Sequence, residues 1–171
     1  MPDIVSDIMG EEKVKDTAKV TDRMRNLCSR REYCRSDIMK KAAADLDGDA
    51  VKAAEIVQKL IDEKYIDDLR YASAFARDKS SISGWGEVKI RYMLQAKGIS
   101  QEDISSALAD IDDDRASSKL YKLLETKARS LKNDPQKGLK LKRFALSRGY
   151  GYDEVSKMVD TILYNENDDS L

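Results

Sequence analysis

The sequence contains no histidine, only two cysteines and two prolines, and aromatic residues make up 6% of its 171 residues. Without histidine, the chain lacks the commonest general base near neutral pH and the commonest metal ligand, so serine–histidine and cysteine–histidine catalysis are excluded. Cys28 and Cys34 do not have the CxxC spacing of a metal or redox site, and we interpret them as reduced thiols. No run of 18 apolar residues and no secretory signal pattern occurs, which predicts a cytoplasmic protein with no membrane partner.

Charged residues make up 37% of the chain. Ala, Leu, Lys, Glu, Asp and Arg dominate the composition, and they favour helices. No segment alternates apolar and polar residues for long enough to indicate a strand. Apolar residues recur instead at helical spacing, as in Ala53, Ile56, Val57, Leu60 and Ile61. The pattern predicts an all-α protein with nine helices.

Gly48, Gly98 and Gly149 lie 50 and 51 residues apart, and each stands between two amphipathic stretches. A fixed period of this size is typical of tandem supersecondary units, which present extended binding surfaces more often than catalytic pockets. A single irregular helical bundle, with the glycines as unrelated helix C-caps, is the alternative. We expect three tandem three-helix repeats between two tails: a flexible N-terminal tail at 1–16, repeats at 17–65, 66–111 and 112–164, and an acidic C-terminal tail at 165–171.

Capping signals mark several predicted helix starts. Asp49 suits a helix N-cap, and Ser100 with Asp103 three residues later has the spacing of a capping box. The pair Asp134-Pro135 predicts a further helix start, because a capping acid precedes a proline at the first helical position. The acidic run at 110–114 lacks the glycine and the ligand spacing of a calcium loop, so we interpret it as a polar junction with an N-cap.

Charge is segregated along the chain, although the formal net charge is only −1. Residues 115–148 contain eleven basic residues and two acidic ones, whereas residues 99–114 contain six acidic residues and no basic one. The basic segment indicates either a polyanionic or acidic partner, or a solvated helix face that acidic helices neutralise. Aromatic residues near these bases suit stacking on single-stranded nucleic acid, although Phe144 also falls on an apolar stripe and is predicted to be core.

The most specific part of the sequence lies between residues 65 and 99. It contains Asp68-Leu69-Arg70-Tyr71-Ala72, then Trp85-Gly86, then Lys97-Gly98-Ile99. These motifs resemble those of the RecX family, the regulators of the bacterial recombinase RecA. The resemblance covers about residues 20–164 and is strongest in the second repeat. Upstream, Cys34 stands where a serine N-cap is common in the family, which leaves Ser36 as an alternative cap.

The resemblance implies three three-helix repeats in an elongated, curved array, with no catalytic residue, metal or cofactor. It implies a protein that binds RecA filaments on DNA, lies along the filament groove and blocks strand exchange, ATP hydrolysis and coprotease activity. Such a protein regulates homologous recombination, DNA repair and the SOS response. The implied partner is the RecA filament, with single- or double-stranded DNA as a further partner, and a monomer is expected.

The motif residues also have structural interpretations. Tyr71 and Phe75 lie on a helix face that is predicted to be core. Asp68 suits a helix cap or a hydrogen bond from Arg70 or a neighbouring repeat, so structural roles are favoured for both residues. Trp85 stands between two glycines, where it either plugs a junction between repeats or anchors a partner; the plug is favoured.

Two functions remain in competition: a RecA filament regulator, and a helical DNA-binding module that acts without RecA. Catalysis finds no support, because the sequence has neither a nucleophile elbow nor a phosphate loop. Charge and helix position, rather than any motif, select the candidate contact residues: Arg70 and Arg91 in the second repeat, and Lys137, Lys140, Arg143 and Arg148 in the third.

Overall fold

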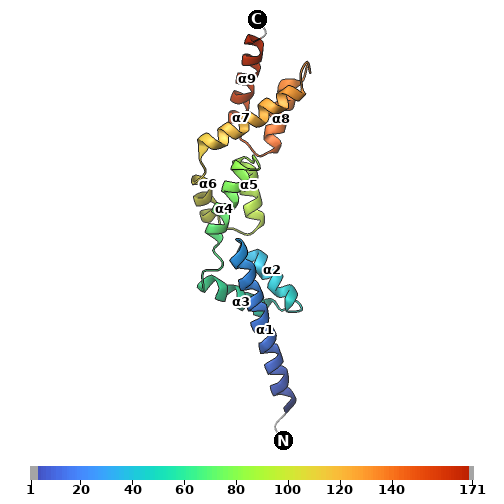
Figure 1. Ribbon diagram of the computed structural model, residues 1–171, viewed down its shortest axis with the longest axis vertical. Coiled ribbons are helices and arrows are strands. Elements are labelled where there is room, and N and C mark those ends of the chain that lie inside the picture. The colour runs from blue at the N-terminus through green and yellow to red at the C-terminus, as the bar shows by residue number, and fades with distance from the viewer. Residues whose placement is uncertain (1–3, 170–171) are drawn as a thin grey trace. The chain divides into compact units, whose positions relative to one another are not determined.

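The computed structural model describes the backbone of residues 4–169 and the side chains of residues 17–169. Over these residues the chain forms nine helices and no strand, which confirms the predicted all-α class (Figure 1). The helices are α1 (Ile4–Arg30), α2 (Arg35–Asp45), α3 (Ala50–Asp62), α4 (Asp68–Ser81), α5 (Glu87–Ala96), α6 (Gln101–Ala109), α7 (Asp113–Ser130), α8 (Lys137–Ser147) and α9 (Tyr152–Asp168).

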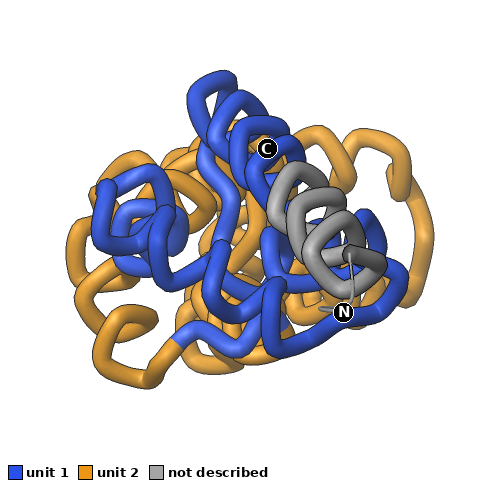
Figure 2. Tube along the Cα trace, turned by 90° about the horizontal axis from the view of Figure 1, so that it is seen from below, with its two compact units in different colours: residues 1–72, 97–99 blue, residues 73–96, 100–171 orange. Residues whose placement is uncertain are grey.

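The chain divides into two compact units (Figure 2). Unit 1 comprises residues 1–72 and 97–99, and unit 2 comprises residues 73–96 and 100–171. Unit 1 therefore contains α1, α2, α3 and the start of α4, together with the turn that follows α5. Nine helices fit three three-helix repeats, and the repeat boundaries given above remain a prediction.

Helices extend into both segments that the sequence predicts to be tails. The backbone is helical from Ile4, well inside the expected N-terminal tail, and α9 continues to Asp168. Residues 4–16 include Glu11, Glu12, Lys13 and Lys15, which have good helix propensity. The tail predictions for residues 1–3 and 170–171 lie outside the described residues.

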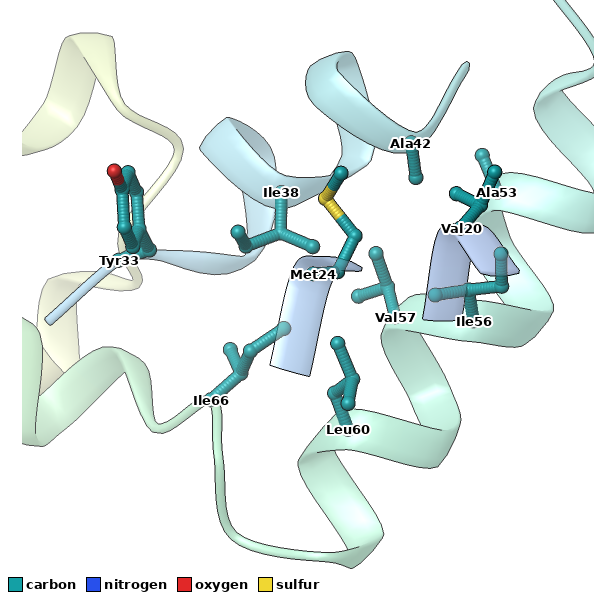
Figure 3. Close-up of a cluster of buried hydrophobic side chains, with 10 residues drawn as sticks. All are labelled: Val20, Met24, Tyr33, Ile38, Ala42, Ala53, Ile56, Val57, Leu60 and Ile66. Carbon is teal, nitrogen blue, oxygen red and sulfur yellow. The ribbon is translucent and has the colours of Figure 1, made fainter. Parts of the chain in front are cut away.

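Three helices form the core of unit 1 (Figure 3). The apolar stripe predicted for residues 53–61 is confirmed, because four of its five residues are buried on α3 and Ile61 packs against them. A fully buried aliphatic side chain contributes about 1.5–3 kcal/mol relative to an exposed one. The cluster consists of Val20 and Met24 from α1, Ile38 and Ala42 from α2, Ala53, Ile56, Val57 and Leu60 from α3, and Tyr33 and Ile66 from the connections.

A second core forms from the last three helices, within unit 2. Phe144 packs against this cluster and is half-buried, which confirms its assignment to the apolar stripe. The buried members are Leu120, Leu124 and Ala128 from α7, Leu141 and Ala145 from α8, Val155, Val159 and Ile162 from α9, and Tyr150 from the turn before α9.

Local capping agrees with the sequence at three helix starts and differs at one. The side chains of Asp49, Ser100 and Asp112 each accept a hydrogen bond from the backbone N–H three residues later. The helix predicted to begin at Asp134-Pro135 begins two residues later, after Gln136. Asp134 closes a turn instead, because its carboxylate accepts the Gln136 N–H at 2.8 Å. The acid–proline pair therefore initiates a turn that leads into α8.

Gly48, Gly98 and Gly149 all adopt positive φ, at 87°, 76° and 89°. Each lies in a turn between two helices, as the repeat spacing predicts. A side chain is costly in this left-handed region, so the three positions favour glycine.

Candidate functional site

The Asp68 side chain caps the start of α2 from a distant part of the sequence. Its Oδ1 accepts a hydrogen bond from the backbone N–H of Arg35 at 2.8 Å. Cys34 occupies the N-cap position and makes no side-chain capping bond. Ser36, the alternative cap, instead donates its hydroxyl to the Lys97 carbonyl oxygen at 2.6 Å. A carboxylate 33 residues downstream thus satisfies an N–H in the first turn of α2, whereas a serine at position 34 would accept from an N–H two or three residues later.

Arg70 ties together three backbone segments of unit 1. Its Nε donates to Glu32 Oε1 at 2.6 Å, and its Nη2 donates to the carbonyl oxygens of Lys64 and Tyr65 at 3.2 and 3.3 Å. The hydrogen bond to Glu32 raises the pKa of Arg70 above its ordinary value. Arg70 was predicted as a contact residue, and two of its three side-chain hydrogen bonds hold the connection between α3 and α4.

The Lys97-Gly98 turn meets the first turn of α2. Lys97 Nζ donates to both carboxylate oxygens of Asp37, at 2.7 and 3.0 Å. Partial burial by itself raises the pKa of Asp37, but the hydrogen bond and charge of Lys97 hold it below its ordinary value. We call this arrangement of Asp68, Lys97 and Gly98 around the start of α2 the unit 1 joint. Two of the three motifs that carry the resemblance, those at 68–72 and 97–99, therefore meet at one structural position.

An equivalent arrangement, the unit 2 joint, connects the start of α5 with the Arg148-Gly149 turn. The backbone N–H of Gly86 donates to the Arg148 carbonyl at 2.7 Å, and that of Val88 donates to the Gly149 carbonyl at 3.0 Å. Arg148 Nη1 donates to the Ser83 carbonyl at 3.0 Å. The two backbones approach so closely that a Cβ at Gly86 would lie 2.3 Å from the Gly149 carbonyl carbon. Arg148, a predicted contact residue, is engaged in this joint.

Trp85 packs within unit 2 beside the same joint. Its ring lies edge-on to Phe75 at a centroid distance of 6.1 Å. The ammonium groups of Lys79 and Lys89 lie 4.7 and 4.2 Å from the ring centre. Such cation–π contacts add modest stability at a partly exposed site. The ring is half-buried and also lines a small pocket, which we consider below.

The remaining predicted contact residues belong to unit 2 and differ in their solvent exposure and in their ion pairs. Arg91 forms an ion pair with Glu87 at 2.8 Å, and Lys137, only 16% exposed, pairs with Glu166. Lys140 is 44% exposed and pairs with Asp134. Arg143 is exposed on the same helix, three residues further on. Residues three apart are neighbours on a helix surface, so Lys140 and Arg143 form the most available pair.

One basic surface was not among the predicted contact residues. Arg115, Lys119 and Lys122 lie along α7 and, with Ser81, line a hollow of about 300 Å³. We call this surface the α7 basic hollow. Its signal was present in the sequence, since the three bases follow the i, i+4, i+7 spacing of one helix face. The sequence does not indicate that a hollow lies beside them, because Ser81 comes from α4.

Comparison with known proteins places these features in a family. Residues 67–108 match the family model described as "RecX, second three-helix domain". The regulatory protein RecX of Chromohalobacter salexigens is 35% identical over 133 residues, which cover 75% of this chain and 83% of that protein. The chain belongs to the RecX family. The range matched by the family model contains Asp68, Arg70, Lys97 and Gly98. The second three-helix domain of RecX therefore includes most of the unit 1 joint.

Other relatives agree. The regulatory protein RecX of Clostridium tetani is 33% identical over 115 residues, or 65% of this chain and 52% of that protein. The chain thus spans about half the length of several curated RecX relatives that it matches. The crystal structure of RecX from Lactobacillus salivarius has a TM-score of 0.76 and 27% identity, covering 87% of this chain and 97% of that one. Another RecX crystal structure has a TM-score of 0.78 and 26% identity, covering 90% of this chain and 76% of that one.

Among the described residues, no helix combines the length and the apolar character that a membrane span needs. In the same part of the chain, no three His, Cys, Asp or Glu side chains are grouped so as to hold a metal ion.

Proposed function

We propose that this chain binds RecA–DNA filaments in the cytoplasm and inhibits RecA ATP hydrolysis, strand exchange and coprotease activity, without catalytic activity of its own. The observation that carries the proposal is membership of a family whose curated relatives are named regulatory protein RecX. Basic faces on α7 and α8 of unit 2 support it, because they suit the phosphates of filament DNA or an acidic protein surface.

The mechanism we favour is occupancy of the filament groove by one monomer. Each unit is held by its own joint, so its surface keeps a defined shape when it meets a partner. Several weak contacts to successive RecA protomers add up, because the second contact is intramolecular once the first has formed. Lys140 and Arg143 on α8 are exposed and lie outside both joints, so they are the side chains we favour for such contacts.

The test is RecA ATP hydrolysis on single-stranded DNA, titrated with this protein at two salt concentrations. Inhibition far below one molecule per RecA indicates filament capping or disassembly, and inhibition near saturation indicates groove occupancy. Unchanged ATP hydrolysis and strand exchange at stoichiometric amounts contradict the proposal.

A second function, DNA binding without RecA, is favoured by the α7 basic hollow. Three bases around one hollow suit a DNA phosphate, and each phosphate contact steepens the dependence of log affinity on log salt by about 0.9. The double variant Lys119→Glu/Lys122→Glu is therefore expected to flatten that slope by about two in a DNA-binding titration without RecA. Absence of DNA binding at low salt excludes this function and leaves the RecA-dependent one standing.

A further inference from the structure

A small pocket in unit 2 is built differently from the basic faces. Its volume is about 150 Å³, and its walls come from the starts of α5, α7 and α9 and from α6. Its charged lining consists of Glu87, Asp113 and Glu154, and no basic residue lines it among the described ones. None of these residues belongs to the predicted contact surface.

The three carboxylates belong to residues that keep solvent exposure, and they repel one another. Burial, and then the charges of Asp113 and Glu87, raise the pKa of Glu154 above its ordinary value. Glu87 has a partner in Arg91, which lies one turn along α5. Negative charge gathered in this way is stabilised by a cation placed among the carboxylates, and the pocket has room for one.

Tyr150 provides an independent observation at the same place. Its side chain is 5% exposed and lines the pocket, and its hydroxyl has no hydrogen-bond partner among the described residues. Burial raises the pKa of Tyr150 to about 12, so the hydroxyl stays protonated and its oxygen can accept a hydrogen bond. A buried polar group without a partner is uncommon and costly, and a bound donor would satisfy this one.

The rest of the lining is apolar and includes Ile90, Leu108 and the ring of Trp85. A lining that combines apolar side chains with carboxylates fits a side chain that has an aliphatic stem and a cationic head. The volume is below the range of about 300–1,000 Å³ that small-molecule sites occupy, and the charge repels nucleic acid. The three carboxylates come from three different helices, α5, α7 and α9, which suits the five donors of a guanidinium better than the compact charge of lysine.

We propose that this pocket binds one arginine side chain of the protein partner, with the guanidinium among Asp113, Glu154 and the Tyr150 hydroxyl. The inference rests on the proposed function in one respect, since the partner is the filament-forming protein. The pocket adds a contact of opposite sign to the basic faces and so favours a protein surface over DNA alone.

The binding test uses Trp85, the single tryptophan of the chain, as the fluorescent reporter in the wall of the pocket. The full chain is titrated with Nα-acetyl-arginine amide, and with the citrulline amide of nearly the same shape and no charge, at matched ionic strength. We expect the arginine compound to change the fluorescence saturably and the citrulline compound not to. Equal responses to both, or no saturable response to arginine, would overturn the inference.

Variants of the pocket and a matched control test whether the fluorescence change comes from binding in the pocket. Glu154→Gln and Tyr150→Phe are expected to weaken arginine binding, the first by about tenfold or more, because hydrogen bonds to charged groups are the strong ones. Asp153→Asn removes the same charge from the same turn of α9, outside the lining, and is expected to leave binding unchanged. Thermal unfolding of each free variant checks folding. Equal weakening by Asp153→Asn contradicts the assignment.

A second experiment distinguishes failure of this inference from failure of the proposed function. In the RecA ATP hydrolysis assay, Glu154→Gln is expected to raise the concentration needed for half-inhibition, and Asp153→Asn is not. If wild type inhibits RecA and Glu154→Gln inhibits equally well, the pocket inference fails while the proposed function stands. If wild type binds the arginine compound but does not inhibit RecA, the proposed function fails. The pocket then still binds arginine, but RecA is not the protein that supplies the side chain.

Discussion

The two joints join a helix start to a glycine turn by different means. In the unit 1 joint, side chains make the connection: Asp68 caps α2, and Lys97 pairs with Asp37. In the unit 2 joint, two backbone N–H groups donate directly to the carbonyls of Arg148 and Gly149. A Cβ at Gly98 would meet no atom within 4 Å, whereas one at Gly149 would lie 2.3 Å from Lys89 Cβ.

This difference teaches that two glycines at equivalent places in a repeat can be required for different reasons. At Gly98 the requirement is conformational, since φ is positive and space is free. At Gly149 it is conformational and steric, because the neighbouring backbone leaves no room. A joint made by side chains is weakened only in part when one side chain is replaced. A joint made by backbone hydrogen bonds is lost when the two backbones can no longer approach each other closely.

The largest effect is expected for Gly149→Ala. Left-handed strain of about 1–2 kcal/mol adds to overpacking of about 1–3 kcal/mol, so the free energy of unfolding should fall by about 2–5 kcal/mol. Gly98→Ala, the matched control, should lose only the strain, about 1–2 kcal/mol. Urea denaturation of the full chain measures both. Equal losses for the two variants would remove the distinction between the joints.

Asp68→Ala comes next, because it leaves the first N–H of α2 without its carboxylate. The expected loss is about 1–2 kcal/mol in the free energy of unfolding. Asp68→Asn keeps a carbonyl acceptor at the same place and should recover most of this loss. If the alanine variant is as stable as wild type by urea denaturation, α2 does not depend on this cap.

Lys97→Met tests the ion pair of the unit 1 joint and should cost about 0.5–1 kcal/mol near neutral pH, since the pair is partly exposed. Asp37 has a lowered pKa in the folded state, so its contribution is present above the ordinary aspartate pKa and is lost as pH falls below it. Unfolding at a series of pH values from about 7 to about 3 should therefore show wild type and variant converging in acid. A constant difference across this range would show that Lys97 stabilises the joint by packing alone.

The smallest effect on stability is expected for Lys140→Glu/Arg143→Glu, which lies outside both joints. The free energy of unfolding should change by no more than about 0.5–1 kcal/mol, while inhibition of RecA weakens. Lys40→Glu/Lys59→Glu makes the same charge change on unit 1 and serves as the control. If the α8 variant inhibits RecA as strongly as wild type does, the α8 face is not part of the proposed interface.

Much of the fold follows from local patterns. The stripe on α3 and the caps at Asp49 and Ser100 were predictable, because their partners lie within four residues. The start of α8 was less predictable, because the Asp134 carboxylate accepts a hydrogen bond within a turn and does not cap the helix. The three glycine turns were predictable from spacing, since a left-handed residue between two helices favours glycine strongly.

The candidate site depended more on distant contacts. Arg70 and Arg148 were predicted as contact residues from charge and helix position, and both donate to groups that lie elsewhere in the fold. The α7 basic hollow has its bases at helical spacing, but Ser81 completes it from another helix. Which charges are free for a partner therefore could not be read from charge and helix position.

The sequence by itself determined the helices, the glycine turns and the family, because capping, periodicity and a motif are properties of short segments. Only the tertiary structure decided that Asp68 caps a helix 33 residues upstream, that Gly149 has no room for a Cβ, and that Tyr150 lines the same pocket as three carboxylates. The physical reason is that hydrogen bonds, steric contact and dehydration act through space. They depend on partners that the chain brings together only when it folds.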